Sequence, residues 1–314
     1  MAERWRHMTE SHALLVCVAM LGACDTRPEV VVFHAASLAT TLDAAAKVLE
    51  KGHAPYRLRL EPSGSQVAAR KISELGLRAD VVMLADVALI NELLVPARAS
   101  WALQFATTEI VLAHRDHSRY TDEVTSANWP EILLRDDVRL GCVDADLAPI
   151  GYRTQLVWQL AQADLVQRLG AHCRPEHTMP DESELWALLE ARAVDYAFLY
   201  RSTALDHHLK TTALVPEINL GSYSFASTYA RAVVRVRLHG HDAPVLVYGT
   251  PIAFGLTVPR DAPHVSDALA FVQWLLGEQG RAVLRKAGLV PLIPAVATPP
   301  DAIPEALRAL VRRG

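Results

Sequence analysis

The sequence predicts an α/β protein in which the chain builds two lobes. Strand-like apolar runs alternate with helical runs between residues 30 and 86, which is the pattern of successive βαβ units. The run Ala79–Asp86 is apolar between two acids, and this favours a strand buried on both faces of a parallel sheet. The alternation begins again at residue 140, and we interpret the apolar run 105–113 before it as a strand that crosses into the second lobe.

The first strand leads into a turn whose residues suit an anion. Apolar residues Val30–Phe33 are followed by His34-Ala35-Ala36-Ser37 and then by a helical run. A second strand-like run, 57–61, leads through Ser63-Gly64-Ser65 into a helical run over 66–76. A serine at the start of a helix places its hydroxyl beside free backbone N–H groups. We therefore expect two serine-headed helices that face one ligand, although a plain helix N-cap is the commoner role of such a serine.

The later elements repeat this pattern. In the second lobe we expect a strand, a turn, a long amphipathic helix, another helix and another strand at 140–143, 148–152, 153–169, 182–191 and 195–200. The chain then returns through strands at 233–238 and 245–257, and helices at 265–277 and 278–287 close the first lobe. We assign residues 24–106 and 244–314 to lobe 1 and residues 107–243 to lobe 2. The Pro/Ala-rich tail 295–304 either packs or frays.

The composition excludes several classes of protein. Hydrophobic residues make up 51% of the chain and charged residues 21%, as in a globular protein and unlike a disordered one. The formal net charge of −4 provides no basic excess for binding nucleic acid. An anion site in this chain must therefore depend on local N–H and hydroxyl dipoles.

The N-terminus has the pattern of a bacterial lipoprotein. Arg4 and Arg6 precede the apolar run 13–21, which is too short to span a bilayer and has the length of a signal-peptide core. The run ends in Leu21-Gly22-Ala23-Cys24, which resembles a lipobox. The resemblance implies removal of a signal peptide at 1–23 and a lipid on Cys24. An ordinary signal peptide is the alternative. No later run reaches the roughly 18 apolar residues of a transmembrane helix, so we expect a soluble body tethered outside the cytoplasmic membrane, in the periplasm or its equivalent.

Two cysteines remain in the expected mature chain, Cys142 and Cys173. In an oxidising compartment they could form a disulfide. Cys142 also lies in a run that predicts a buried strand, and a free cysteine is common in such a core. The sequence leaves both states open.

Nine short motifs occur in order between residues 29 and 294. They are FHAASL (33–38), SGS with ARKISELG (63–76), ADVVMLAD (79–86), FATTEIVLAH (105–114), NWPEILLR (128–135), APIGYR (148–153), DYAFLYRS (195–202), PEINLG (216–221) and GTPIAFGLTVP (249–259). Together they resemble the molybdate/tungstate-binding proteins of ABC importers, and within that family the tungstate/molybdate branch best known from archaea. The resemblance implies a type II periplasmic-binding-protein fold, in which each lobe has a central mixed sheet flanked by helices and a tetrahedral oxyanion lies in the cleft between the lobes.

The resemblance also implies a set of donors to the oxyanion. The residues at the matching positions are Ala36, Ser37, Ser65, Ile150, Glu182 and Tyr200. The two serines and the tyrosine match hydroxyl donors, whereas Ala36, Ile150 and the helix start at Glu182 match backbone N–H donors, as does Ser37 in addition to its hydroxyl. A strand-end core aromatic is the alternative role for Tyr200.

Two positions depart from the archaeal branch. Ala148 stands where that branch has an Asp before the Pro of its turn, and Leu199 stands where it has a Glu before the Tyr of its strand. In the branch those two carboxylates approach the metal and expand its tetrahedral coordination. We therefore predict a four-coordinate molybdate or tungstate that is held only by hydrogen bonds, with no protein ligand to the metal.

Two other functions remain open. A receptor for sulfate or another tetrahedral oxyanion would suit the lost carboxylates. His34 lies close to Ser37 in the sequence and could form the nucleophile–base pair of a serine hydrolase. The chain has no G-x-S-x-G motif and no clear Asp partner, so we expect that the protein is not an enzyme and that His34 only ends a strand.

The other polar groups are expected to have ordinary roles. His172, Cys173 and His177 lack the paired spacing of a structural zinc site and are expected in surface loops. Arg70-Lys71 and Arg153 are expected to be solvated or rim charges that raise the local anion concentration. We expect a monomer without a cofactor, whose partners are the oxyanion, ABC permease subunits and the membrane through the lipid anchor.

Overall fold

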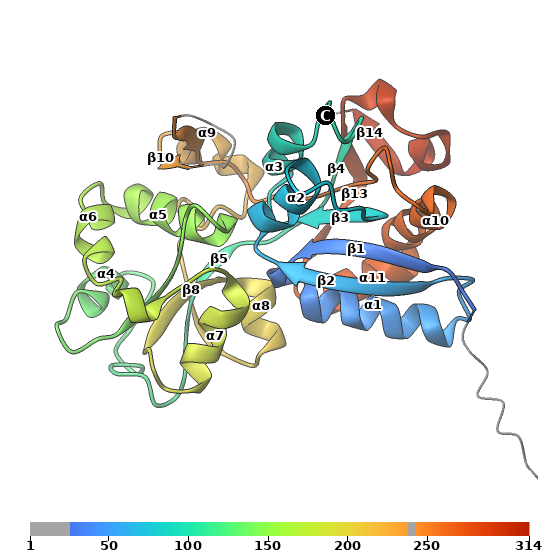
Figure 1. Cartoon of the computed structure of the whole chain (residues 1–314). Coiled ribbons are helices and arrows are strands. Elements are labelled where there is room, and N and C mark those ends of the chain that lie inside the picture. The colour runs from blue at the N-terminus through green and yellow to red at the C-terminus, as the bar shows by residue number, and fades with distance from the viewer. Residues whose placement is uncertain (1–25, 238–242, 314) are drawn as a thin grey trace, which may run out of the picture.

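The computed structural model describes residues 26–237 and 243–313. The expected signal peptide at 1–23 and the expected lipid-anchor residue Cys24 lie outside the described residues. In the described part of the chain, no helix is both long enough and apolar enough to cross a membrane. The chain folds into two lobes that lie side by side (Figure 1).

The first lobe is built on a seven-stranded sheet with the order β14-β13-β4-β12-β3-β1-β2. Its strands are β1 (Glu29–Ala35), β2 (Arg57–Ser63), β3 (Val81–Leu84), β4 (Ala102–Thr107), β12 (Phe254–Thr257), β13 (Val290–Thr298) and β14 (Val311–Arg313). All of β3 is buried and it runs parallel to β1, as predicted, but it pairs with β12 in the antiparallel sense. The sheet is therefore mixed, because its centre receives a strand that returns from the second lobe.

Helices cover both faces of this sheet. They are α1 (Ala39–Lys51), α2 (Ser65–Ser73), α3 (Val87–Leu93), α10 (Val265–Leu276) and α11 (Glu278–Lys286), with short 3-10 turns η1 (Ala36–Leu38), η4 (Pro300–Ala302) and η5 (Glu305–Leu310). Helices α1 and α11 lie on one face, and α2 and α3 lie on the other (Figure 1). The tail does not fray, because β13 is hydrogen-bonded between β4 and β14.

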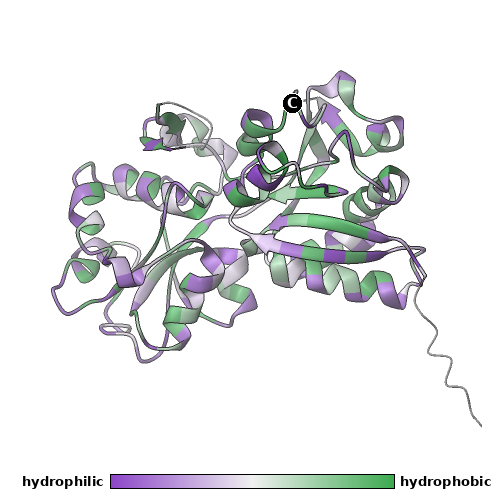
Figure 2. Cartoon of the chain, viewed as in Figure 1, coloured by the Kyte–Doolittle hydropathy of each residue, from purple (hydrophilic) through white to green (hydrophobic). Residues whose placement is uncertain are grey.

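The second lobe is built on a five-stranded sheet with the order β7-β6-β8-β5-β9. Its strands are β5 (Ile110–His114), β6 (Leu140–Val143), β7 (Thr178–Met179), β8 (Tyr196–Tyr200) and β9 (Lys210–Ala213). Its helices are α4 (Trp129–Leu133), α5 (Pro149–Ala161), α6 (Leu165–Gly170), α7 (Glu182–Glu190) and α8 (Arg201–Asp206), with η2 at Pro175–His177. This sheet is mixed as well, since β8 is parallel to β6 and antiparallel to β5. Figure 2 shows hydrophobic residues along the strands of both lobes and hydrophilic residues on the outer faces of the helices.

The chain passes twice between the lobes. The predicted single strand at 105–113 is two strands, β4 and β5, which the residues Thr108 and Glu109 separate and which belong to different sheets. The return follows η3 (Tyr223–Phe225), α9 (Ala226–Tyr229) and a hairpin of β10 (Val233–Val236) and β11 (Val245–Tyr248). The passages are hydrogen-bonded at the junction, since the N–H of Ile110 donates to Asn219 and the N–H of Ile252 donates to Leu220.

The predicted long helix at 153–169 is also divided. Helix α5 ends at Ala161, Gln162 is extended with φ −163°, and α6 begins at Leu165. Leu156 and Val157 before the break and Leu165 after it are all buried, so the helical spacing of apolar residues continues across the interruption. The periodicity therefore could not reveal where the helix stops.

A disulfide joins Cys142 on β6 to Cys173 after α6, with 5.7 Å between the Cα atoms. The sequence left this pairing open, because it depends on how α6 returns to the sheet. The bond closes a loop with a sequence separation of 31. Loops of this size give a stabilisation of about 2–4 kcal/mol, so the disulfide stabilises the second lobe and ties the chain after α6 to β6.

Candidate functional site

One cavity at the junction of the two lobes contains all six residues that the sequence indicated. It holds about 210 Å³ of space between atoms. The first lobe lines it with Ala35, Ala36, Ser37, Gly64, Ser65 and Ala85, and the second lobe with Ala148, Pro149, Ile150, Asp181, Glu182 and Tyr200. Each lobe thus contributes six lining residues, so the shape of the cavity depends on how the two lobes are placed.

Helices α2 and α5 begin at this cavity without a side-chain cap. Gly64 precedes α2 and Ala148 precedes α5, and neither helix has an acidic residue in its first turn. The first N–H groups of a helix have no acceptor inside the helix, so these two ends present free donors. Helices α3 and α7 differ, because Asp86 and Asp181 accept hydrogen bonds from their first N–H groups.

The two serines do not act as helix caps. Ser65 lies inside the first turn of α2, and Ser37 lies in η1 before α1. Ser65 Oγ accepts a hydrogen bond from the N–H of Ala85 at 3.0 Å, so its own hydrogen is available to another acceptor. Ser37 Oγ is buried without a hydrogen-bond partner among the described residues. Both hydroxyls can therefore donate into the cavity.

The hydroxyl of Tyr200, like that of Ser65, accepts one hydrogen bond and keeps its own hydrogen free to donate. Its Oη accepts a hydrogen bond from Arg153 Nη1 at 2.9 Å, and a guanidinium can only donate. The phenol hydrogen must therefore be directed to some other acceptor. Burial raises the pKa of Tyr200 above its usual value, which keeps that hydrogen in place. The second lobe thus contributes a hydroxyl donor that matches the serines of the first lobe.

Arg153 does not lie at the rim, and that prediction was wrong. Its side chain is 2% exposed, and it lies between the lobes with Nη2 2.9 Å from Asp86 Oδ2. Burial alone would lower the pKa of Arg153, but the Asp86 carboxylate and the neighbouring tyrosine hydroxyls hold it above its usual value. No pattern in the sequence indicates this burial, since arginine is usually exposed. Arg70 and Lys71, in contrast, are only partly buried and pair with Glu74 and Glu61.

Glu182 lines the cavity and carries a buried carboxyl group in addition to the backbone N–H that the resemblance implied. Its side chain is buried, with Oε1 accepting the N–H of Tyr200 at 2.7 Å and Oε2 lacking a partner in the described part of the chain. Burial raises the pKa of Glu182 to about 8, and the carboxylates of Asp181 and Asp206 add to that rise. At neutral pH the group is therefore mostly uncharged.

The two positions that depart from the archaeal pattern lie in different surroundings. Ala148 lines the cavity. Leu199 is fully buried in a separate apolar cluster with Leu185, Leu189 and Ala204. This follows from strand geometry, because successive side chains of β8 point to opposite faces and Tyr200 points to the cavity. Neither position therefore supplies a carboxylate to this cavity, and its acidic lining residues are Asp181 and Glu182.

The features of a serine hydrolase are not assembled. His34 is buried in β1, and its Nδ1 lies 2.9 Å from the backbone oxygen of Ala35. Its Nε2 and Ser37 Oγ each lack a hydrogen-bond partner among residues 26–237 and 243–313, so the two are not bonded to each other. Burial lowers the pKa of His34, and the ring fits a strand-end core residue. Over the same residues, no group of three or more His, Cys, Asp or Glu side chains could hold a metal ion.

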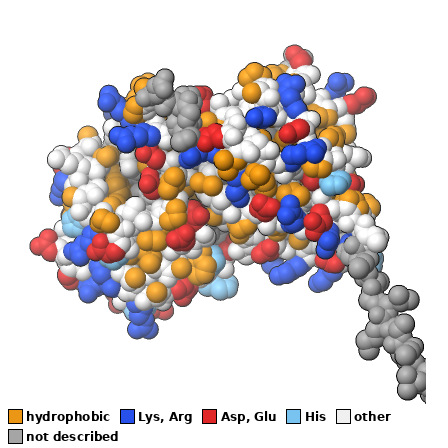
Figure 3. Space-filling model, in the orientation of Figure 1, with side chains coloured by type: hydrophobic (Ala, Val, Ile, Leu, Met, Phe, Trp, Pro, Cys, Tyr) orange, Lys and Arg blue, Asp and Glu red, His pale blue; other side chains and the backbone are white. Residues whose placement is uncertain are grey.

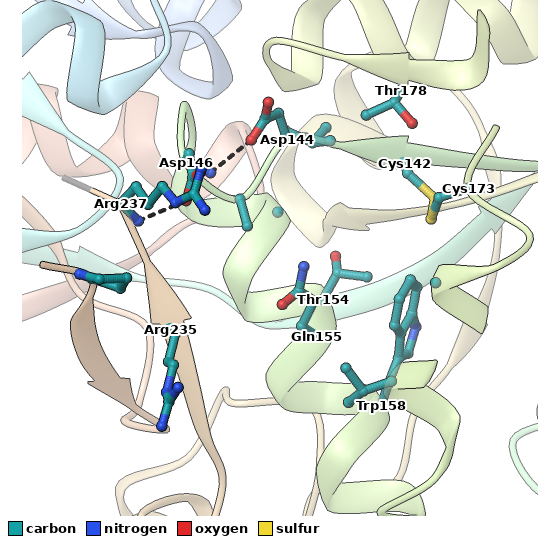
Figure 4. A pocket seen from close by; sticks show the side chains of 16 residues that line it. Cys142, Asp144, Asp146, Thr154, Gln155, Trp158, Cys173, Thr178, Arg235 and Arg237 are labelled. Atoms are coloured by element: carbon teal, nitrogen blue, oxygen red, sulfur yellow. Dashed lines mark hydrogen bonds between the residues drawn. A yellow bond between two sulfur atoms is a disulfide. The ribbon is translucent and has the colours of Figure 1, made fainter. Parts of the chain in front are cut away.

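A larger cavity of about 1360 Å³ lies on the other side of α5 (Figure 4). The Cys142–Cys173 disulfide, Trp158, Asp144, Asp146 and Arg235 are among its lining residues. None of the six predicted site residues lines it. The smaller cavity is lined by all six and receives residues from both lobes, so we place the candidate site there. On the visible face of the molecule, basic and acidic side chains are interspersed, without a basic stripe (Figure 3).

Comparison with known proteins identifies the family. The model of the bacterial extracellular solute-binding proteins matches residues 30–290, and the chain belongs to this family. A solute-binding protein of Petrotoga mobilis is 36% identical over 300 residues, 94% of each chain. A Pyrococcus abyssi protein, named as the molybdate/tungstate-binding protein WtpA, is 34% identical over 315 residues, 90% of each chain.

Solved structures show the same fold at low sequence identity. The periplasmic molybdate-binding protein of Azotobacter vinelandii aligns with a TM-score of 0.63 at 16% identity, covering 84% of this chain and 99% of that one. The sulfate-binding protein SubI of Mycobacterium tuberculosis aligns with a TM-score of 0.58 at 15% identity, covering 85% and 88%. These likenesses agree with the two-lobed type II fold.

Closure of the lobes requires a glycine at position 64. A Cβ there would lie 2.8 Å from the backbone oxygen of Leu147 in the second lobe. We expect Gly64→Ala to hold the lobes apart and to weaken ligand binding by about 5- to 150-fold, since such overpacking costs about 1–3 kcal/mol. The thermal midpoint without ligand should change little, because the clash is between lobes. Small-angle scattering and calorimetry measure the two effects. Gly170→Ala is the matched control, since nothing lies within 4 Å of its Cβ; equal binding by both variants would contradict the prediction.

Proposed function

We propose that this protein is the substrate-binding subunit of an ABC importer and that it captures molybdate or tungstate. The observation that carries the proposal is a cavity between two lobes that is lined by hydroxyl and N–H donors. A divalent oxyanion offers four acceptor oxygens and needs donors around it. Ser37, Ser65 and Tyr200 each have a hydroxyl hydrogen free to donate, and the uncapped ends of α2 and α5 add N–H groups and roughly 0.3–1 kcal/mol each of favourable dipole interaction.

The relatives support the choice of ligand. The Pyrococcus abyssi protein and a Thermococcus kodakarensis protein, both 34% identical, are named as molybdate/tungstate-binding. Sulfate is the second candidate, because SubI shares the fold and because neither Ala148 nor Leu199 supplies a carboxylate to a metal. Sulfate needs the same donors, so selection between the two anions would rest on cavity size.

The proposal also covers the two lobes, the attachment to the membrane and the permease. We propose that residues 24–106 with 244–314 and residues 107–243 act as the two lobes, that a lipid on Cys24 tethers a monomer to the outer face of the membrane, and that permease subunits recognise the closed form. The protein would act as a receptor and not as an enzyme, with the oxyanion as its ligand and no cofactor.

Calorimetry with molybdate, tungstate, sulfate and phosphate tests this function. We expect molybdate and tungstate to bind much more tightly than the other two anions. Ser37→Ala and Ser65→Ala should each weaken binding by about 10- to 100-fold, since a hydrogen bond to a charged group contributes about 1.5–3 kcal/mol. Circular dichroism should show intact folding. Sulfate binding as tight as molybdate binding would favour the second candidate, and serine variants with unchanged affinity would refute the site.

The coordination of the metal can be tested by X-ray absorption on the loaded protein. We propose that molybdate or tungstate stays tetrahedral here, since Ala148 has no carboxylate and Leu199 points away from the cavity. The expected spectrum has four short metal–oxygen distances and no longer oxygen shell. Additional oxygens at carboxylate distances would contradict the proposal, and their loss in Glu182→Gln would identify their source.

The affinity should depend on pH through Glu182. Because its folded-state pKa is raised to about 8, the carboxyl group stays uncharged below that pH and becomes anionic above it. An anionic Glu182 repels a bound dianion, so the affinity should be constant from about pH 6 to 7.5 and fall by up to about tenfold per pH unit above 8. Glu182→Gln should remove this dependence and retain the neutral-pH affinity. A flat profile for the unmodified protein would show that Glu182 does not face the anion.

A further inference from the structure

A buried chain of hydrogen bonds connects the two lobes directly beneath the candidate site. Ser65 Oγ accepts the N–H of Ala85, and the carbonyl oxygen of Ala85 accepts Arg153 Nη1 at 2.6 Å. The same nitrogen donates to Tyr200 Oη at 2.9 Å. Arg153 Nη1 thus donates one hydrogen to Ala85 in the first lobe and the other to Tyr200 in the second. The hydroxyl groups at the two ends of this chain belong to Ser65 and Tyr200, and both residues line the cavity.

An ion pair across the interface accompanies this chain. Asp86 Oδ2 in the first lobe lies 2.9 Å from Arg153 Nη2 and accepts a hydrogen bond from Tyr152 Oη at 2.7 Å. Its other oxygen, Oδ1, accepts the N–H of Ala88 at the start of α3. Every contact of Asp86 with Tyr152 and Arg153 joins different lobes, and each is lost when the lobes separate.

Other buried carboxylates lack this property. Asp80 pairs with His264 inside the first lobe, and Asp195 pairs with Arg139 and Arg119 inside the second. Those pairs hold one lobe together in any arrangement of the two. The Arg153 guanidinium, by contrast, is buried between the lobes, and its desolvation is offset by Asp86 of the other lobe.

We infer that Arg153 is a positioning residue that couples closure of the lobes to orientation of the donor hydroxyl of Tyr200. When the lobes meet, Arg153 binds Ala85 and Asp86 and donates to Tyr200 Oη, so the phenol hydrogen has to turn to a different acceptor. In the open form Arg153 loses its partners in the first lobe, so Ala85 and Asp86 no longer hold the guanidinium in place against the tyrosine hydroxyl. The inference deepens the proposed function, since the acceptor of that hydrogen is the oxyanion.

A double-mutant cycle tests this coupling. We expect Arg153→Met and Tyr200→Phe each to weaken molybdate binding by about tenfold. If Arg153 acts through the tyrosine, Tyr200→Phe should change the affinity by no more than about threefold in the Arg153→Met background. A double variant whose affinity is about a hundredfold weaker than that of the unmodified protein would overturn the inference, because the two effects would then be independent. An Arg153→Met variant with unchanged affinity would overturn it as well. Arg139→Met is the control, since its ion pair lies within one lobe, and it should bind normally.

Scattering without ligand tests the closure step separately. Asp86→Asn retains an oxygen for the N–H of Ala88 but removes the charge opposite Arg153. We expect a larger radius of gyration for this variant than for the unmodified protein, and equal radii would overturn the closing role. If Arg153→Met does not fold, Asp86→Asn replaces it in the cycle with Tyr200→Phe. An unmodified protein that binds no oxyanion would refute the proposed function, whereas normal binding with unaffected variants would refute only the present inference.

Discussion

The junction of the lobes depends on the contacts that the Asp86 carboxylate makes with Tyr152 and Arg153. The carboxylate caps α3 with one oxygen and receives Tyr152 and Arg153 from α5 with the other. A buried guanidinium next to an anion cavity would ordinarily be a strong attractive charge, but this carboxylate neutralises it. The groups left to donate into the cavity are therefore hydroxyls and backbone N–H groups. Binding through such donors avoids burying a second full charge, which would need a partner of its own.

Two of the three hydroxyl groups of the site, those of Ser65 and Tyr200, share one arrangement. Ser65 and Tyr200 each accept a hydrogen bond from a group that can only donate, an amide in one case and a guanidinium in the other. Each oxygen is thus fixed as an acceptor on its structural side and as a donor on its cavity side. Glu182 follows the same rule, since Oε1 accepts the amide of Tyr200 and burial keeps a proton on the carboxyl group near neutral pH.

Much of the fold and of the candidate site could be predicted from the sequence, because both depend on local patterns. Apolar runs marked the central strands, and the motifs around Ser37, Ser65, Ile150 and Tyr200 indicated residues that do meet at one cavity. The burial of Arg153 could not be predicted, since Asp86 and the neighbouring Tyr152 are 66 residues apart in sequence and meet only when two lobes close. The disulfide was undecidable because it depends on how the chain after α6 returns to β6 within the second lobe. The break between α5 and α6 was hidden because the apolar spacing continues through it.

The equal division of the cavity between the lobes has a consequence for release. A ligand that touches both lobes is bound by the sum of their contributions, so separating the lobes removes one whole set of donors in a single movement. The dissociation constant then rises by the full factor that this set contributed, without a change in any residue. A membrane partner that pulls the lobes apart can therefore unload a tightly held solute in the same step that exposes it, and tight capture from a dilute medium need not slow delivery.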